Sequence, residues 1–268
     1  MGNQVPRTNS YICHMPASNE KHLVGLVGPE VLSAIEADSM HPVFLDISAC
    51  NALEIRYDFF DEKDWPGLSA RIRKIAPNAM QIDTIRLVRD GGKFPDRLAH
   101  SRLPLWSEIL KAAEVPEWLD LEHDCLHALH DLKVFADLRK TRIVISQHNF
   151  LRIPNQLELA DFARDCIRLH ADGLKIAAMS NSETDCDRLY KFAKDFASDF
   201  ELFAAFGMGE TGIASRVWSL KAGANLTYAA IGKAQAPGQV EVSRMERAIR
   251  ELENLESPQK ALEIIKKM

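Results

Sequence analysis

Short apolar or β-branched runs recur along the chain, separated by longer stretches with helical periodicity. Runs of this length, bounded by polar or turn-forming residues, predict buried strands. We predict eight of them: HLVGLVG (22–28), ALEIRYD (52–58), QIDTIRL (81–87), WLDLEH (118–123), TRIVISQH (141–148), GLKIAAM (173–179), ELFAAFGMG (201–209) and LTYAAIG (226–232).

Two of the intervening stretches have a clear amphipathic pattern. Residues 155–171 repeat apolar side chains at steps of three or four, with Leu157 and Ile167 at the ends of the expected apolar face. Residues 182–198 show the same spacing, and Ser182 is the expected N-cap. Both stretches are therefore predicted to be helices with one buried face.

The predicted strands and helical stretches alternate at intervals of roughly 25–35 residues, the size of a βα unit. No Pro/Gly/Ser-rich linker divides the series. Eight such units predict a single (β/α)8 barrel over residues 22–268, preceded by a polar leader over residues 1–21. A doubly wound open sheet is the alternative, but GLVGPEV after the first strand lacks the G-x-G-x-x-G nucleotide turn.

Composition narrows the class of protein. The 268 residues are 46% hydrophobic and 26% charged, as in ordinary globular proteins. A net charge of -5 gives no reason to expect nucleic acid or an anionic membrane as a partner. No run approaches the roughly 20 apolar residues of a membrane span, and five scattered cysteines indicate reduced thiols. We therefore expect a soluble, cytoplasmic protein.

A lysine interrupts the apolar run ADGLKIAAMS, although an unpaired ammonium is costly in a dry interior. Arg56, Arg86 and Arg216 are expected at the same end of the barrel, and neighbouring cations favour the neutral amine of Lys175. A neutral amine attacks a carbonyl to form a Schiff base. His148, at the end of the fifth predicted strand, is the natural base for the carbon that the iminium acidifies.

Each candidate also has a structural interpretation. Lys175 alone is compatible with a strand-end lysine that reaches solvent, and His148 with a hydrogen-bonded structural histidine. Glu54, Arg56 and Asp58 alternate along the second strand and so share one face, where they form either a buried ion-pair network or part of a site. We assign Asp58 to structure. The combination of these groups favours Schiff-base chemistry on a small keto acid.

The histidines in EHDCLHALH have a spacing that is also found in metal sites. The same spacing suits the exposed polar face of a helix, and we expect no metal at His123, His127 and His130. Asp120 and Glu122, on the preceding predicted strand, are interpreted as structural charges beneath the site.

Six segments, in order along most of the chain, resemble the type I 3-dehydroquinate dehydratase family: LEIRYD (53–58), IRLVRDGG (85–92), VISQHNF (144–150), GLKIAAMS (173–180), MGETGIASR (208–216) and APGQ (236–239). The resemblance implies a (β/α)8 barrel, usually a homodimer, that uses neither metal nor cofactor. It also implies dehydration of 3-dehydroquinate to 3-dehydroshikimate in the shikimate pathway.

The resemblance also implies roles for individual residues. Lys175 matches the Schiff-base lysine that attacks the C3 ketone of the substrate, and His148 matches the general acid/base. Asp90 stands where the family usually has a glutamate that orients the histidine. The matching substrate-binding positions are Glu54, Arg56, Arg86, Arg216, Gln235 and Gln239.

Several positions depart from the family pattern, among them Gln147, where a tyrosine is common, and the segment KAGANLTY (221–228). Asp90 is one methylene shorter than the usual glutamate, Gln235 replaces a serine, and Gly25 stands where some members have a serine on the first strand. These changes leave two alternatives open beside the dehydratase. One is a related Schiff-base lyase or aldolase for another keto acid, and the other is a weakly active descendant that binds quinate- or shikimate-like ligands as a regulatory module.

Overall fold

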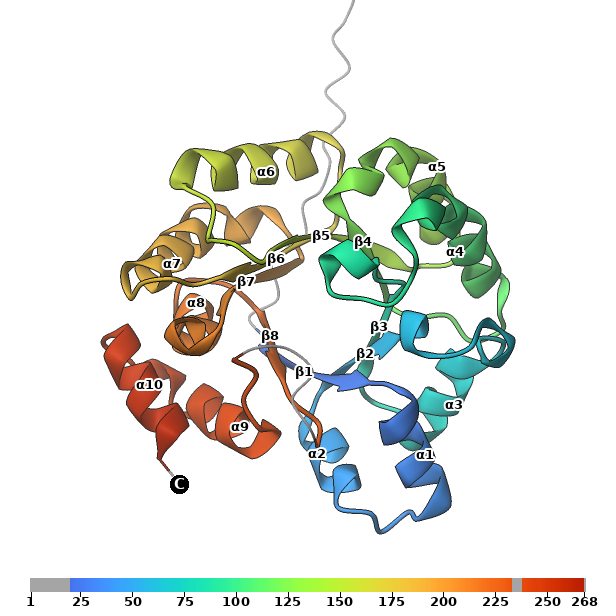
Figure 1. The fold of residues 1–268 in the computed structure, drawn as a ribbon, viewed down its shortest axis with the longest axis horizontal. Coiled ribbons are helices and arrows are strands. Elements are labelled where there is room, and N and C mark those ends of the chain that lie inside the picture. The colour runs from blue at the N-terminus through green and yellow to red at the C-terminus, as the bar shows by residue number, and fades with distance from the viewer. Residues whose placement is uncertain (1–19, 233–237, 268) are drawn as a thin grey trace, which may run out of the picture.

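Eight parallel strands form the centre of the molecule (Figure 1). The computed structural model describes residues 20–232 and 238–267, with only the backbone of residues 126–128. Neighbouring strands pair in the order β7-β6-β5-β4-β3-β2-β1-β8. Their bounds are β1 His22–Val27, β2 Ala52–Arg56, β3 Met80–Thr84, β4 Trp118–Glu122, β5 Arg142–Asn149, β6 Gly173–Met179, β7 Leu202–Met208 and β8 Leu226–Ala229.

The sheet curls into a nearly closed barrel, which confirms the predicted (β/α)8 fold. Asn225 bridges the seam between β7 and β8. Its backbone N–H donates to the carbonyl of Phe203 at 3.0 Å, and its side-chain oxygen accepts the N–H of Phe203 at 2.7 Å. The division at residue 21 stays a prediction, because residues 1–19 lie outside the described part.

Helices surround the barrel (Figure 1). Their bounds are α1 Pro29–Ala37, α2 Val43–Ala49, α3 Leu68–Ile75, α4 Arg102–Lys111, α5 Leu126–Leu138, α6 Gln156–Arg168, α7 Thr184–Phe196, α8 Ser215–Lys221, α9 Val242–Arg250 and α10 Pro258–Lys266. Short 3-10 turns lie between them: η1 Tyr57–Phe59, η2 Glu62–Asp64, η3 Val88–Asp90, η4 Asp96–Ser101, η5 His123–Cys125, η6 Ala197–Asp199, η7 Glu210–Gly212 and η8 Leu252–Asn254. Within the described ranges, no helix has the length and apolar character to cross a membrane.

The helices predicted from periodicity are present, although one cap differs. Asn155 accepts backbone N–H groups of the first turn of α6, and the Glu158 carboxylate accepts the N–H of Asn155 at 2.7 Å, which completes a capping box. The prediction that Ser182 caps α7 is wrong. The helix starts at Thr184 without a side-chain cap, and the Ser182 hydroxyl lies 2.9 Å from that of Thr184. Asp185 accepts the N–H of Ser182 at 3.1 Å.

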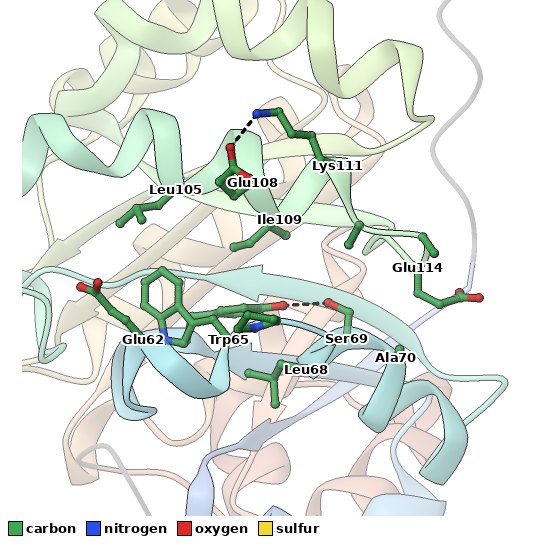
Figure 2. Close-up of a pocket in the computed structure, with 15 residues that line it drawn as sticks. Glu62, Trp65, Leu68, Ser69, Ala70, Leu105, Glu108, Ile109, Lys111 and Glu114 are labelled. Carbon is green, nitrogen blue, oxygen red and sulfur yellow. Dashed lines mark hydrogen bonds and ion pairs between the residues drawn. The ribbon is translucent and has the colours of Figure 1, made fainter.

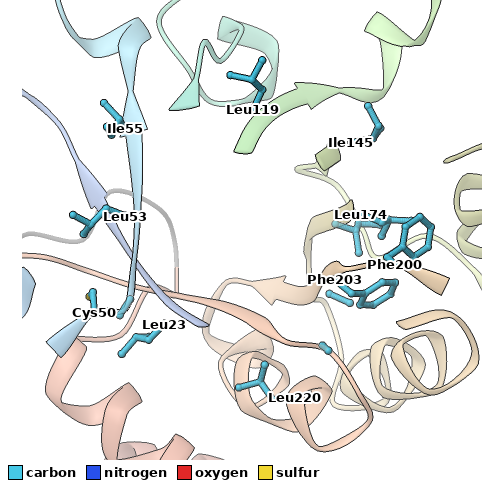
Figure 3. Packing of buried hydrophobic residues seen from close by; sticks show 14 of the residues in the cluster. Leu23, Cys50, Leu53, Ile55, Leu119, Ile145, Leu174, Phe200, Phe203 and Leu220 are labelled. Atoms are coloured by element: carbon cyan, nitrogen blue, oxygen red, sulfur yellow. The ribbon is translucent and has the colours of Figure 1, made fainter. Parts of the chain in front are cut away.

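Alternating side chains along the strands produce two apolar layers. One fills the barrel below the site and includes Val24 and Val144. The other lies between sheet and helices, where Leu53, Leu174 and Phe203 pack (Figure 3). Because consecutive positions on a strand face opposite layers, every strand except β3 contributes apolar side chains to both; the outward positions of β3 are the polar Gln81 and Asp83.

The geometry places one departure from the family pattern and corrects one predicted helix face. Gly25 faces the outer layer, where a Cβ would lie 2.2 Å from Cδ1 of Ile231, so its departure from the family pattern does not alter the barrel interior. Leu157 and Ile167 are 73% and 37% exposed, and so they are not on the buried face of α6. That face consists of Leu159, Ala160, Phe162, Ala163 and Cys166.

A cavity of about 620 Å³ lies outside the barrel, between α3 and α4 (Figure 2). Trp65 and Ile109 contribute apolar surface to it. The Tyr57 hydroxyl, also in its lining, is 2.9 Å from Oγ of Ser69, which donates to Oδ2 of Asp83 at 2.8 Å. Burial raises the pKa of Asp83 to about 7. This polar chain therefore belongs to the packing of α3 on β3.

Candidate active site

A second cavity, of about 290 Å³, opens at the C-terminal ends of the strands. Active sites of (β/α)8 barrels lie at this end, because the βα loops converge there. Most of the predicted site residues line this cavity: Glu54, Arg56, Arg86, Asp90, His148, Lys175, Arg216 and Gln239. Gln235 lies outside the described residues.

Lys175 lies on the inner face of β6 and is nearly buried. Its Nζ donates to Oε2 of Glu54 and to Oδ2 of Asp120, both at 2.9 Å, and lies 4.3 Å from the centre of the Tyr228 ring. The nearest charges are thus carboxylates, whereas the sequence argument placed arginines beside the amine. The Lys175 side chain is therefore held by two carboxylate acceptors.

Arg86 and Ser146 fix one of these acceptors. Arg86 donates from Nη2 to Oδ2 of Asp120 and from Nη1 to Oγ of Ser146, both at 2.7 Å. Ser146 in turn donates to Oδ1 of Asp120 at 2.5 Å. Burial alone would raise the pKa of Asp120, but Arg86 and Lys175 outweigh it and hold the pKa below its ordinary value. Asp120 is therefore a fixed anion below the Lys175 amine.

Glu54 is the less constrained of the two carboxylates. Besides Lys175, the charges of Asp120, Arg86 and Arg56 act on it, and Nη2 of Arg86 lies 3.9 Å from Oε1. Burial opposes ionisation of Glu54, yet the positive charge of Lys175 and then of Arg86 leaves its pKa lowered overall. Glu54 is consequently an anion in direct contact with the amine.

His148, at the end of β5, has no partner for Nδ1 among the described residues. The nearest acidic group is Asp90, whose Oδ1 lies 4.0 Å from Nδ1, beyond hydrogen-bonding distance. Burial, with the charges of Arg86 and Lys175, lowers the pKa of His148 well below its ordinary value. The imidazole is thus held neutral, the form in which it accepts a proton.

Asp90 lies on the loop that follows β3, in the 3-10 turn η3. Burial raises the pKa of its carboxyl, and the negative charge of Glu122 adds to this effect. Arg86 and Arg89 act in the opposite direction without cancelling it.

The two remaining arginines of the cavity differ in their partners. Arg56 forms a two-pronged pair with Asp58, with Nε and Nη2 at 2.9 and 2.7 Å from the carboxylate oxygens. Arg216 is buried against the ring of Phe206 and donates from Nε to the carbonyl of Gly238 at 2.9 Å. Its Nη1 has no partner among the described residues, and burial lowers its pKa to about 10.

An arginine without an acidic partner is the expected receptor for an anion, since a bound carboxylate would compensate its burial. Within residues 20–232 and 238–267, no ion pair of Arg216 is found. Arg216 is therefore the cation in the cavity that is best placed to take an anionic substrate group.

One group of possible metal ligands lies beside the cavity. Oxygen and sulfur atoms of Glu122, Asp124 and Cys125 approach one another within 4.8 Å. Arg102 and Arg89 already pair with these acidic groups, and their positive charge opposes a cation there. His123 lies 3.9 Å from Asp165 and packs edge-on against Phe162, and the side chain of His127 lies outside the described set.

Comparison with known proteins agrees with this arrangement. The sequence profile described as Type I 3-dehydroquinase matches residues 31–256. A 3-dehydroquinate dehydratase of Hydrogenobaculum sp. is 26% identical over 212 residues, which cover 79% of this chain and 93% of the relative. One of Methanosarcina barkeri is 28% identical over 206 residues, with 75% and 85% covered.

Solved structures show the same fold. The 3-dehydroquinate dehydratase from Geobacillus kaustophilus superposes with a TM-score of 0.77 at 22% identity, covering 88% of this chain and 93% of that one. The type I enzyme from Clostridium difficile, solved with covalently modified comenic acid, has a TM-score of 0.76 at 21% identity, covering 89% and 93%.

Proposed function

The chain belongs to the type I 3-dehydroquinase family, and from that premise we propose that it dehydrates 3-dehydroquinate to 3-dehydroshikimate through a Schiff base on Lys175. The observation that carries this proposal is the position of Lys175. A buried amine at the carboxyl end of the barrel shares one cavity with His148, whose imidazole is neutral, and with Arg216.

The first step requires a neutral amine. Glu54 is 2.9 Å from Nζ and accepts the proton of the Lys175 ammonium, while Asp120 stays ionised because Arg86 and Ser146 hold it. The amine then adds to the C3 ketone to give a carbinolamine. Loss of the carbinolamine oxygen as water gives a protonated imine, which withdraws electrons from C2.

His148 acts on the carbon chain. Its neutral imidazole removes a proton from C2, and the electron pair of that bond forms an enamine with the imine carbon. The electrons of the enamine then form the C1–C2 double bond and expel the C1 hydroxyl. This hydroxyl takes the proton from His148 and leaves as water. Hydrolysis of the remaining imine releases the conjugated enone and restores the Lys175 amine.

Arg216 takes the substrate carboxylate, since its Nη1 is unpartnered among the described residues. Arg56 and Gln239, which both line the cavity, are proposed to bind hydroxyl groups, with Arg56 held in place by Asp58. A role for Gln235 is proposed from the family resemblance alone. The same resemblance leads us to propose a cytoplasmic homodimer.

Borohydride reduction tests the covalent step. With 3-dehydroquinate present, reduction should add the mass of the reduced ligand to the wild-type chain, on the peptide that contains Lys175, and Lys175→Ala should show no adduct. The relative from Clostridium difficile that carries covalently modified comenic acid supports such chemistry in the family. Reversible binding of the ligand without any trapped mass would favour a regulatory binding protein, and trapping of other keto acids alone would favour a different lyase.

A further inference from the structure

The loop that carries Asp90, residues 87–94, is a tight turn with fixed ends. The N–H of Phe94 donates to the carbonyl of Arg86 and the N–H of Val88 to that of Phe94, both at 3.0 Å. Gly92 permits this turn, because a Cβ there would lie 2.1 Å from the Arg86 carbonyl oxygen. The loop is also held further along, where the N–H of Lys93 donates to Oδ2 of Asp58 at 3.0 Å and the N–H of Arg89 to Oδ1 of Asp96 at 3.1 Å. The contacts of its first residues add to these and fix its start.

Glu122 holds the first residue of the loop. This glutamate ends β4, is 3% exposed, and accepts the N–H of Leu87 on Oε1 at 3.2 Å. The same oxygen lies 3.3 Å from Nη1 of Arg86. Glu122 is absent from the lining of the catalytic cavity, so its contacts are with the loop and with other side chains.

Arg102, the first residue of α4, pairs with Glu122 from the other side. It is 2% exposed, and its guanidinium also donates to the carbonyl of Ile85 at 3.0 Å and to Sγ of Cys125 at 2.6 Å. A single guanidinium thus ties the end of β3 to β4 and α4. Burying both charges is costly unless each is paired and hydrogen-bonded, and each group here has a charged partner and further hydrogen bonds.

We propose that Glu122 and Arg102 are positioning residues that hold the 87–94 loop so that Asp90 faces His148. The inference rests on the proposed function, in which His148 is the base and Asp90 its orienting group. A displacement of about 1 Å at such a group costs up to 100-fold in rate. Asp90 and His148 are already 4.0 Å apart, so a loop movement that increased this distance would weaken their interaction further.

The negative charge of Glu122 also predicts an effect on the pH dependence of the rate. The groups that act on Asp90 are Glu122 from β4, Arg86 from β3, Arg89 from the loop itself and Arg102 from α4, and His148 faces it from β5. Of these, Glu122 is the anion that raises the pKa of Asp90. Neutralising Glu122 should lower the pKa of Asp90, so Asp90 would remain ionised to lower pH. The acid limb, which is the fall of kcat at low pH, should therefore shift to lower pH.

Glu122→Gln tests the proposal, because glutamine keeps an acceptor for the N–H of Leu87 and loses the charge. We expect kcat to fall roughly tenfold, because the orienting group would be displaced by a fraction of an ångström. This kcat is normalised to the fraction of chains that borohydride traps with 3-dehydroquinate. KM should stay within about twofold, since the substrate contacts are untouched. The acid limb should move to lower pH.

Glu117→Gln is the matched control. Glu117 lies just before the start of β4, pairs with Arg73 at 2.7 Å and accepts the N–H of Gln81 at 2.7 Å, the same set of contacts at the opposite end of the barrel. We expect its kcat and pH profile to equal those of the wild type. If Glu122→Gln also matches the wild type in both, the positioning role is wrong.

Arg102→Lys separates position from charge and guards against poor folding of the first variant. Lysine keeps a cation for Glu122 but cannot also reach Ile85 and Cys125, so kcat should fall while the acid limb stays in place. Unchanged kcat in this variant would overturn the role of Arg102. A wild type that neither turns over nor traps 3-dehydroquinate would instead refute the proposed function, before either variant is compared.

Discussion

The Asp90 carboxylate lies 4.0 Å from Nδ1 of His148, about 1 Å beyond hydrogen-bonding distance. The imidazole is therefore buried without the acceptor that would fix its tautomer. Aspartate reaches less far than the family's usual glutamate, and Glu122 and Arg102 fix the position of the loop that carries it. The gap is a consequence of side-chain length on a fixed loop.

Asp90→Glu should close this gap. One added methylene supplies about 1.5 Å of reach, and a charge-assisted hydrogen bond to the imidazole is worth about 1.5 kcal/mol, or roughly tenfold in kcat. Steady-state kinetics of the two proteins measure the gain. Asp90→Asn is the control and should lower kcat with little change in KM. If neither substitution alters kcat, Asp90 has no part in the mechanism.

Arg216→Met should weaken substrate binding more than it slows chemistry. The substitution removes the cation that we assign to the substrate carboxylate, and loss of a hydrogen bond between charged groups costs about 1.5–3 kcal/mol. KM should therefore rise by about 10- to 100-fold. Arg152→Met removes an exposed arginine paired with Glu158 and should leave KM unchanged. An unchanged KM in Arg216→Met would place the carboxylate elsewhere.

The pH profile of kcat/KM should extend to low pH. Burial and the charges of Arg86 and Lys175 lower the pKa of His148 well below 6.5, so the base stays neutral as the pH falls through 6.5. Activity should consequently decline only at more acidic pH, where His148 and Asp90 take up protons. A descending limb centred near pH 6.5 would show that His148 behaves as a solvent-exposed histidine and contradict the electrostatic account.

Asp83 should make folding stability fall as the pH rises. Its pKa is raised from 3.8 to about 7, so the folded chain retains a proton that the unfolded chain releases between these values. The free energy of unfolding therefore declines over this window, by at most about 4 kcal/mol for this group. Asp83→Asn keeps an acceptor for Ser69 and should remove this decline in urea titrations at pH 4 and pH 7. Parallel curves for the two proteins would contradict it.

The barrel was predictable because its strands are apolar runs of similar length, and all eight lie within or close to their predicted ranges. Helix faces were less predictable. Leu157 and Ile167 fit an apolar spacing but are exposed. The face of α6 that packs on the sheet depends on the side chains of the neighbouring elements, which the spacing within one helix does not contain. Ser182 failed as a cap because its hydroxyl pairs with the hydroxyl of Thr184 at 2.9 Å instead of accepting a backbone N–H.

Site residues at the strand ends were predictable where the alternation of side chains along a strand points them into the barrel, as for Lys175 and Glu54. Partners from other strands were not. Asp120 alternates with Glu122 on β4, a signal that indicated only structural charge, yet it contacts the Lys175 amine directly. Ser146 gave no signal, because its role depends on the register of β5 against β4 and β6.

The reaction itself is the most direct test of the account. Purified wild-type protein is mixed with 3-dehydroquinate, and the ultraviolet absorbance of the conjugated enone is followed beside Lys175→Ala and Glu122→Gln. The account predicts rising absorbance for the wild type, a slower rise for Glu122→Gln and none for Lys175→Ala. Equal rates in the wild type and Lys175→Ala, or no product from a folded wild type, would contradict it.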